Sequence, residues 1–152
     1  MTHFALNYYE FRGRVGTAGQ PTRDQLEAIC RADFHSVINL STPDTQDTIP
    51  DEGSIVTGNG LNYFQVPVPF ERPEPAHFHT FMGLMNAIEG KNVFVHCGAN
   101  LRVSAFMFHY LQLTCGYTPE EASSPILRAW LPRIDPVWKR FLETDFSERV
   151  PQ

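Results

Sequence analysis

Residues 93–104 read VFVHCGANLRVS, and this stretch decides the fold. Val93 to His96 is an apolar, β-branched run of the kind that forms buried strands. The residues that follow, up to Arg102, are mostly small or polar and predict a tight loop, and from Val103 onward the apolar spacing predicts a helix. A strand that passes through such a loop into a helix directs loop amides and the helix N-terminus at one point, which favours anion binding.

The cysteine that opens this loop, Cys97, is predicted to be the reactive one of the three in the chain. Loop N–H groups, the helix dipole and the nearby Arg102 guanidinium all favour a thiolate over a thiol. Gly98 and Ala99 allow a ligand to approach the backbone closely, Asn100 tolerates a left-handed conformation, and Arg102 presents a planar fork of donors that suits two phosphate oxygens. The predicted phosphate-binding positions are Gly98, Ala99, Asn100, Leu101, Arg102 and Val103.

In the segments on the N-terminal side of this loop, the spacing of hydrophobic residues predicts an α/β fold. β-Branched and aromatic runs at 36–40 and 62–66 are predicted strands that join 93–96. Between the last two strands, apolar residues at offsets of three and four predict a helix over 78–88 that ends near Gly90, and a strand, helix and strand at this length imply parallel pairing. We therefore expect a central, mostly parallel sheet flanked by helices.

Other helix signals lie on either side of these strands. A capping box formed by Thr22 and Gln25 predicts a helix over 21–32. After Arg102 a helix is predicted to stop before Gly116, and further helices to begin at Thr118-Pro119-Glu120-Glu121 and at Asp135-Pro136. Residues 41–60, rich in Thr, Asp, Gly and Pro, are predicted to form a long irregular loop, which is uncommon unless it is functional.

Composition narrows the class of protein. With 152 residues and 42% hydrophobic content, the chain suits one domain spanning 1–152, and its net charge of -5 argues against a nucleic-acid partner. No apolar run is long enough for a membrane span or a signal peptide. Three separated cysteines without a C-x-x-C pair indicate neither a disulfide framework nor a zinc site, so we expect a cytoplasmic protein with no metal and no other cofactor.

The loop resembles the signature of the protein tyrosine and dual-specificity phosphatase superfamily, which reads H-C-x-x-G-x-x-R-[ST]. His96, Cys97 and Ser104 fall in register with it. Asn100, which tolerates the same left-handed conformation, stands where the superfamily has glycine. The resemblance covers roughly residues 8–142 and implies a dual-specificity-phosphatase-like fold.

The arginine departs from that signature. Arg102 follows Cys97 after four residues instead of five, and Val103 occupies the usual arginine position. A bacterial phosphatase-like branch often carries the variant H-C-x-x-N-x-R-V-S. Three further segments look like that branch: 17–22, 37–40 and 66–71.

The resemblance implies a metal-independent phosphomonoesterase. Cys97 would attack phosphorus to form a phosphocysteine, Ser104 would stabilise the thiolate when it leaves, and His96 would orient the loop. The expected substrate is a phosphorylated protein or a small phosphate ester, with inorganic phosphate or vanadate as inhibitors. The displaced Arg102 leaves a second hypothesis, a phosphate-binding protein with impaired catalysis, and a third and weaker one is a sulfur-transfer or arsenate-reducing enzyme.

Four carboxylic acids compete for the role of general acid. Glu71 lies where related phosphatases carry their acid, and the role requires an apolar surrounding that keeps its carboxyl protonated. Asp135 precedes a proline, as does the acid of the low-molecular-weight tyrosine phosphatases, but Asp before Pro is also a common helix cap. Asp44 and Asp47, on the long loop, are the remaining candidates.

Overall fold

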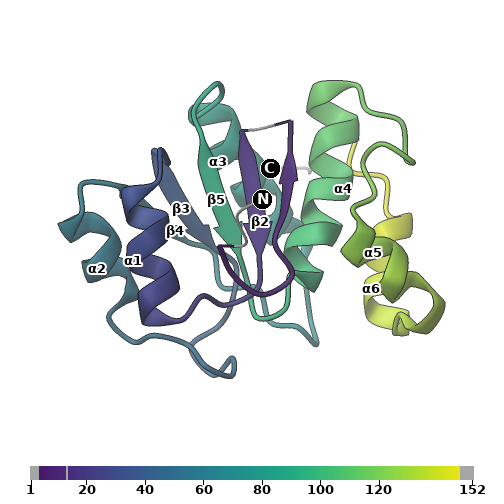
Figure 1. The fold of residues 1–152 in the computed structure, drawn as a ribbon. Helices are drawn as coiled ribbons and strands as arrows, with labels where there is room; N and C mark the ends of the chain where they lie inside the picture. Colours follow the sequence, from purple (N-terminus) through teal and green to yellow (C-terminus); the bar gives the residue numbers. More distant parts are fainter. Residues whose placement is uncertain (1–3, 13, 148–152) are drawn as a thin grey trace.

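The computed structural model describes residues 4–12 and 14–147 and contains a central five-stranded sheet (Figure 1). The strand order is β1-β2-β5-β3-β4; β1 pairs antiparallel to β2, and the other neighbours pair in parallel. The strands are β1 (Tyr9–Phe11), β2 (Val15–Ala18), β3 (Ser36–Asn39), β4 (Asn62–Gln65) and β5 (Val93–His96). This confirms the mostly parallel sheet and the three predicted strands. β1 and β2 were not predicted, because runs of three and four residues carry little periodicity.

Helices cover both faces of the sheet (Figure 1). On one face lie α1 (Arg23–Arg31) and α2 (Glu52–Gly58). On the other lie α3 (Pro75–Ala87), α4 (Leu101–Cys115), α5 (Pro125–Trp130) and α6 (Pro136–Glu143), with a 3-10 turn at Leu131–Arg133 between the last two. None of the helices formed by the described residues is long and apolar enough to span a membrane.

Successive side chains of the central strands point into two different hydrophobic cores, one on each face of the sheet. Ile38 and Val95 pack with α3 to α6, whereas Val37 and Phe94 pack with α1 and α2. All four side chains are fully buried, which explains why these strands are continuously apolar rather than alternating. Each buried side chain of this size contributes about 1.5–3 kcal/mol. The central strands are therefore held firmly at the ends where the cysteine loop begins.

Several predicted helix boundaries are confirmed. The capping box at the start of α1 is formed, with the Gln25 amide 3.2 Å from Thr22 Oγ1 and the Thr22 amide 2.9 Å from Gln25 Oε1. α4 ends at Cys115, and Gly116 follows it in a left-handed conformation, with φ of 70°. The last helix, α6, starts at the Asp-Pro pair as expected.

Two predictions about local structure are wrong. The segment 41–60 is not irregular throughout, because α2 forms within it and buries Glu52 and Val56. The helix expected at Thr118 is only a turn over 119–122, although Thr118 and Glu121 make the reciprocal hydrogen bonds of a capping box. Pro125 explains the stop: it has no N–H to donate, and it holds the residue before it in extended conformation.

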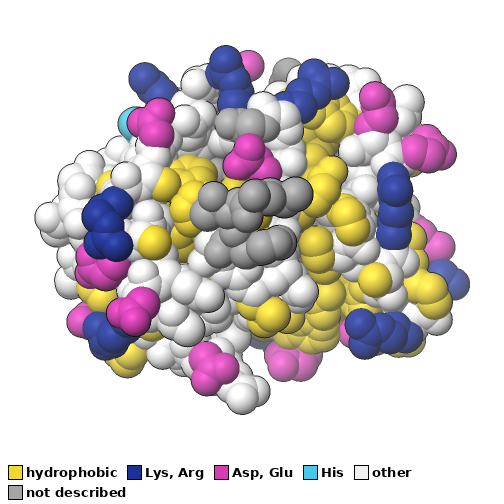
Figure 2. Space-filling model, viewed as in Figure 1, with side chains coloured by type: hydrophobic (Ala, Val, Ile, Leu, Met, Phe, Trp, Pro, Cys, Tyr) yellow, Lys and Arg dark blue, Asp and Glu magenta, His cyan; other side chains and the backbone are white. Residues whose placement is uncertain are grey.

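The surface carries charges of both signs. On the face shown in Figure 2, Lys and Arg side chains alternate with Asp and Glu around the edge, and hydrophobic side chains gather over α4 and its border with β1. Such interspersed charges create no broad field that would attract an anion from a distance. An anionic ligand on this face would depend on local groups.

Candidate active site

The predicted cysteine loop lies at the carboxyl ends of the parallel strands, where ligands commonly bind in α/β folds. A cavity of about 360 Å³ opens there. Five of the predicted site residues line it, namely Cys97, Gly98, Ala99, Leu101 and Arg102, together with Leu6, Gln20, Thr45, Gln46, Asp47 and Phe70. The structure thus brings the predicted nucleophile and the predicted arginine to one cavity.

Asn100 turns the chain from the loop into α4. Its φ of 67° and ψ of 15° place it in the left-handed region, as predicted. Its side-chain Nδ2 donates to the Asn7 carbonyl at 2.8 Å and to Thr17 Oγ1 at 3.1 Å, so the turn is bonded to the segment before β1 and to β2. α4 then begins at Leu101, and the first amides of a helix have no partner within it. Free amides at the start of a helix are the groups that bind anions in other proteins.

Ser104 lies one turn into α4, and its hydroxyl is fully engaged with other side chains. Ser104 Oγ donates to Asn100 Oδ1 at 3.2 Å and accepts from Ser124 Oγ at 3.1 Å. The residue is buried. Ser104 therefore connects the left-handed turn to the start of α5, and its predicted role toward the cysteine thiolate stays a prediction.

The segment after β2 supports the loop from one side. A Cβ atom at Gly19 would lie 2.5 Å from the Gly98 carbonyl oxygen, so a larger residue would push the loop away. The Gln20 amide donates to the same carbonyl at 2.9 Å. These contacts give a physical reason why segment 17–22 resembles the bacterial phosphatase-like branch: Gly19 and Gln20 pack against the cysteine loop and support it.

Arg102 reaches the cavity despite its early position in the sequence. Only 6% of the residue is exposed; its Nη1 donates to the Val68 carbonyl at 2.8 Å and its Nη2 to Thr45 Oγ1 at 3.4 Å. The guanidinium also lies beside the loop, since a Cβ built on Gly98 would be 3.4 Å from Nη2. Val103, at the usual arginine position, is fully buried in the apolar core and does not line the cavity.

The four candidate acids occupy different places. Glu71 is exposed and lines a separate hollow with Arg140, so the structure does not bring it to Cys97. Asp135 Oδ1 accepts the Trp138 amide at 2.9 Å and caps α6. In this structure the Asp135 carboxylate therefore acts as a helix cap.

The two remaining candidates, Asp44 and Asp47, lie on the connection between β3 and β4. A hydrogen bond from Thr42, aided by a backbone amide and by the charge of Arg102, lowers the pKa of Asp44 below its usual value, which disfavours the protonated form that an acid needs. Asp47 lines the cavity itself, with its backbone held at φ of 65°. Non-glycine residues in this conformation often cluster at functional sites.

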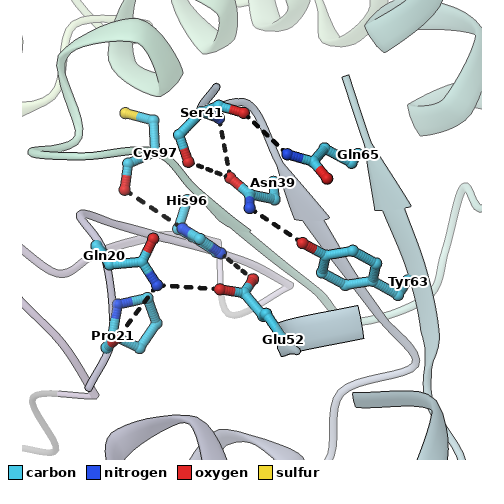
Figure 3. A network of polar contacts seen from close by, with 9 residues as sticks. All are labelled: Gln20, Pro21, Asn39, Ser41, Glu52, Tyr63, Gln65, His96 and Cys97. Carbon is cyan, nitrogen blue, oxygen red and sulfur yellow. Dashed lines mark hydrogen bonds and ion pairs between the residues drawn. The ribbon is translucent and has the colours of Figure 1, made fainter. Parts of the chain in front are cut away.

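Glu52, which contacts His96 behind the cysteine loop, carried no signal in the sequence. Behind the loop, His96 Nε2 lies 2.5 Å from Glu52 Oε2, and Gln20 Nε2 donates to Glu52 Oε1 at 3.0 Å (Figure 3). Both His96 and Glu52 are buried. Burial raises the pKa of Glu52, but hydrogen bonds from His96, Gln20 and Tyr63 and the His96 charge outweigh it, so the pKa is lowered overall.

The fold defines the class of protein: it is one that this chain shares with solved structures of phosphatases. A crystal structure of a candidate phosphatase of the DUF442 family, from Shewanella putrefaciens CN-32, matches with a TM-score of 0.81 and 32% identity, over 90% of this chain and 87% of that one. The chain therefore belongs to the DUF442 family.

More distant structures show the same fold. Tk-PTP in its active form matches with a TM-score of 0.70 and 22% identity, over 90% of this chain and 93% of that one. The core catalytic domain of the PP-IP phosphatase SIW14 from S. cerevisiae matches with a TM-score of 0.73 and 12% identity, over 91% and 85%. No protein-family model and no curated protein matches this chain.

Proposed function

We propose that this protein is a cysteine-dependent phosphomonoesterase that acts through a phosphocysteine intermediate. The observation that carries the proposal is the shared cavity of Cys97 and Arg102 at the N-terminus of α4. The Cys97 thiolate attacks phosphorus, the S–P bond forms, and the ester oxygen leaves with a proton from an acid. Water then attacks the phosphocysteine, gives up a proton to the same group, and releases phosphate and thiolate.

The position of Arg102 supports catalysis rather than binding alone. The hypothesis of impaired catalysis rests on an arginine that points elsewhere, whereas this guanidinium lies beside Gly98 in the cavity. Donors held in place before the reaction stabilise charge that develops on the phosphoryl oxygens. A cysteine phosphatase therefore fits the site better than a phosphate-binding protein.

The decisive experiment is a rate measurement on the purified chain. We expect hydrolysis of p-nitrophenyl phosphate, competitive inhibition by vanadate, and no loss of activity after treatment with a metal chelator. A rate equal to that of buffer, with phosphate binding retained, would instead indicate the phosphate-binding protein. Free thiols at Cys30, Cys97 and Cys115 support a reducing, cytoplasmic compartment for this activity.

The cavity favours a substrate with one phosphate on an aromatic group, such as phosphotyrosine in a protein. Arg102 is the one cation among the described residues that line it, and Leu6, Phe70 and Leu101 offer apolar contacts to a ring. Turnover of a phosphotyrosine peptide should exceed that of a phosphoserine peptide or an inositol polyphosphate by about tenfold or more, the range that apolar pocket contacts supply. Faster turnover of the inositol polyphosphate would refute this preference.

We propose Asp47 as the general acid, because it is the one candidate carboxylic acid that lines the cavity with Cys97. Asp47→Asn should lower kcat on phenyl phosphate by about 10²-fold or more, and less on p-nitrophenyl phosphate, whose leaving group needs little protonation. Glu71→Gln is the matched control and should stay within about twofold of the unmodified protein. A larger loss in Glu71→Gln than in Asp47→Asn would return the role to Glu71.

A further inference from the structure

The His96 ring lies directly behind Cys97, between two oxygen atoms (Figure 3). Its Nε2 is 2.5 Å from Glu52 Oε2, and its Nδ1 is 3.3 Å from the carbonyl oxygen of Cys97. His96 is fully buried and Glu52 is 2% exposed, so water does not compete for these contacts. Each ring nitrogen therefore has one protein partner.

The surroundings of Glu52 indicate that it is ionised. Gln20 Nε2 donates to Glu52 Oε1, and because the same nitrogen also donates to the Pro21 carbonyl at 3.1 Å, the orientation of the Gln20 amide is fixed. A carboxylate that receives several hydrogen bonds stays charged even when it is buried. An ionised Glu52 accepts hydrogen bonds only, as does the Cys97 carbonyl.

With acceptors on both sides, His96 satisfies both contacts only when both ring nitrogens carry a proton. The ring would then be an imidazolium, with its positive charge between Glu52 and the backbone of Cys97. A buried imidazolium without a counter-charge would be costly, and Glu52 supplies that counter-charge at hydrogen-bond distance.

Three other titratable groups face this pair. Burial, and next the charge of Glu52, raise the pKa of Tyr63 on β4, so that its hydroxyl is neutral. On α1, burial and nearby acidic groups, including Glu52, raise the pKa of Cys30. Cys97 is the third and lies on the loop side of the ring. Neither Tyr63 nor Cys30 offers a competing charge at neutral pH.

We propose that Glu52 is a positioning residue that holds His96 as an imidazolium behind Cys97 and thereby favours the Cys97 thiolate. The role of Glu52 in catalysis rests on the proposed phosphatase function. The carboxylate comes from the start of α2, in the same connection between β3 and β4 that brings Thr45 and Asp47 to the cavity. One connection thus supplies both the rear support of the nucleophile and part of the substrate cavity.

The test compares Glu52→Gln with a matched neighbour, Asp51→Asn. Asp51 also carries a carboxylate at the start of α2, but it is exposed and pairs with Arg23 at 2.6 Å. The readouts are the rate at which iodoacetamide alkylates Cys97 at about pH 6.5, followed by peptide mass spectrometry, and the number of N–H protons on His96 seen by heteronuclear NMR. Both readouts work without any phosphate ester, so they stay informative if the protein hydrolyses none.

We expect Glu52→Gln to slow Cys97 alkylation by about tenfold and to leave His96 with one ring N–H, because the counter-charge of the imidazolium is gone. Asp51→Asn should change neither readout by more than about twofold. Unchanged alkylation in Glu52→Gln, or two ring protons retained there, would overturn the proposal. Should Glu52→Gln fail to fold, the unmodified protein decides: two N–H protons on His96 at neutral pH support the proposal, and a neutral ring refutes it.

Discussion

Cys97→Ser should lower turnover of p-nitrophenyl phosphate by about 10⁴-fold or more while phosphate still binds, because a serine hydroxyl is a far weaker nucleophile at neutral pH than a cysteine thiolate. The substitution leaves the loop amides and Arg102 unchanged, so we expect them still to bind the anion. Turnover is measured by steady-state kinetics and binding by calorimetry.

The control for this prediction is Cys115→Ser, at the exposed C-terminal end of α4. It should retain full activity, which would separate loss of the nucleophile from a general effect of removing a thiol. Undiminished activity in Cys97→Ser would refute the assignment of the nucleophile. Rapid acid quenching of the unmodified protein with substrate should, in addition, reveal a phosphorylated Cys97 peptide.

Arg102→Lys should lower kcat by about 10²–10³-fold, the second largest effect that we expect. The guanidinium contacts Val68 and Thr45 while it faces the cavity, and an ammonium group cannot make these contacts and also hold two phosphate oxygens. The measurement is kcat and KM for an aryl phosphate. The conservative control is Arg128→Lys, on α5, which should have little effect.

A double substitution tests whether the site requires its arginine at position 102. Arg102→Val combined with Val103→Arg restores the superfamily spacing but places a charge where Val103 is fully buried in the core. We expect that protein to lose several kcal/mol of stability, measured by chemical denaturation, and all activity. A stable and active exchange variant would show that the site accepts either spacing.

Local sequence information predicted the elements that interact over short distances. The run at 93–96, the loop at Cys97 and the left-handed Asn100 all depend on residues within one turn of each other, and the structure has each of them as expected. The cap of α1 is equally local, since Thr22 and Gln25 are three residues apart. Such features are set by backbone sterics and nearby hydrogen bonds, which the sequence displays directly.

The turn at Thr118 shows where local reasoning fails. Its capping hydrogen bonds form, yet Pro125 and the packing of α5 end the helical conformation after one turn. A nucleated turn continues only when the residues after it also gain by being helical. The sequence at Thr118 thus predicted where a helix could begin, and the residues after it determined that the helix does not continue.

The sequence by itself predicted Cys97 as the nucleophile, the loop around it and the strand and helix on either side of that loop, because these features lie in contiguous residues. Only the tertiary structure showed which carboxylates lie near Cys97 or contact His96. Glu52 meets His96 across 44 residues of chain, Asp47 lines the cavity, and Glu71 faces another hollow. Long-range contacts depend on how helices pack across a sheet, and no spacing within a single segment records that geometry.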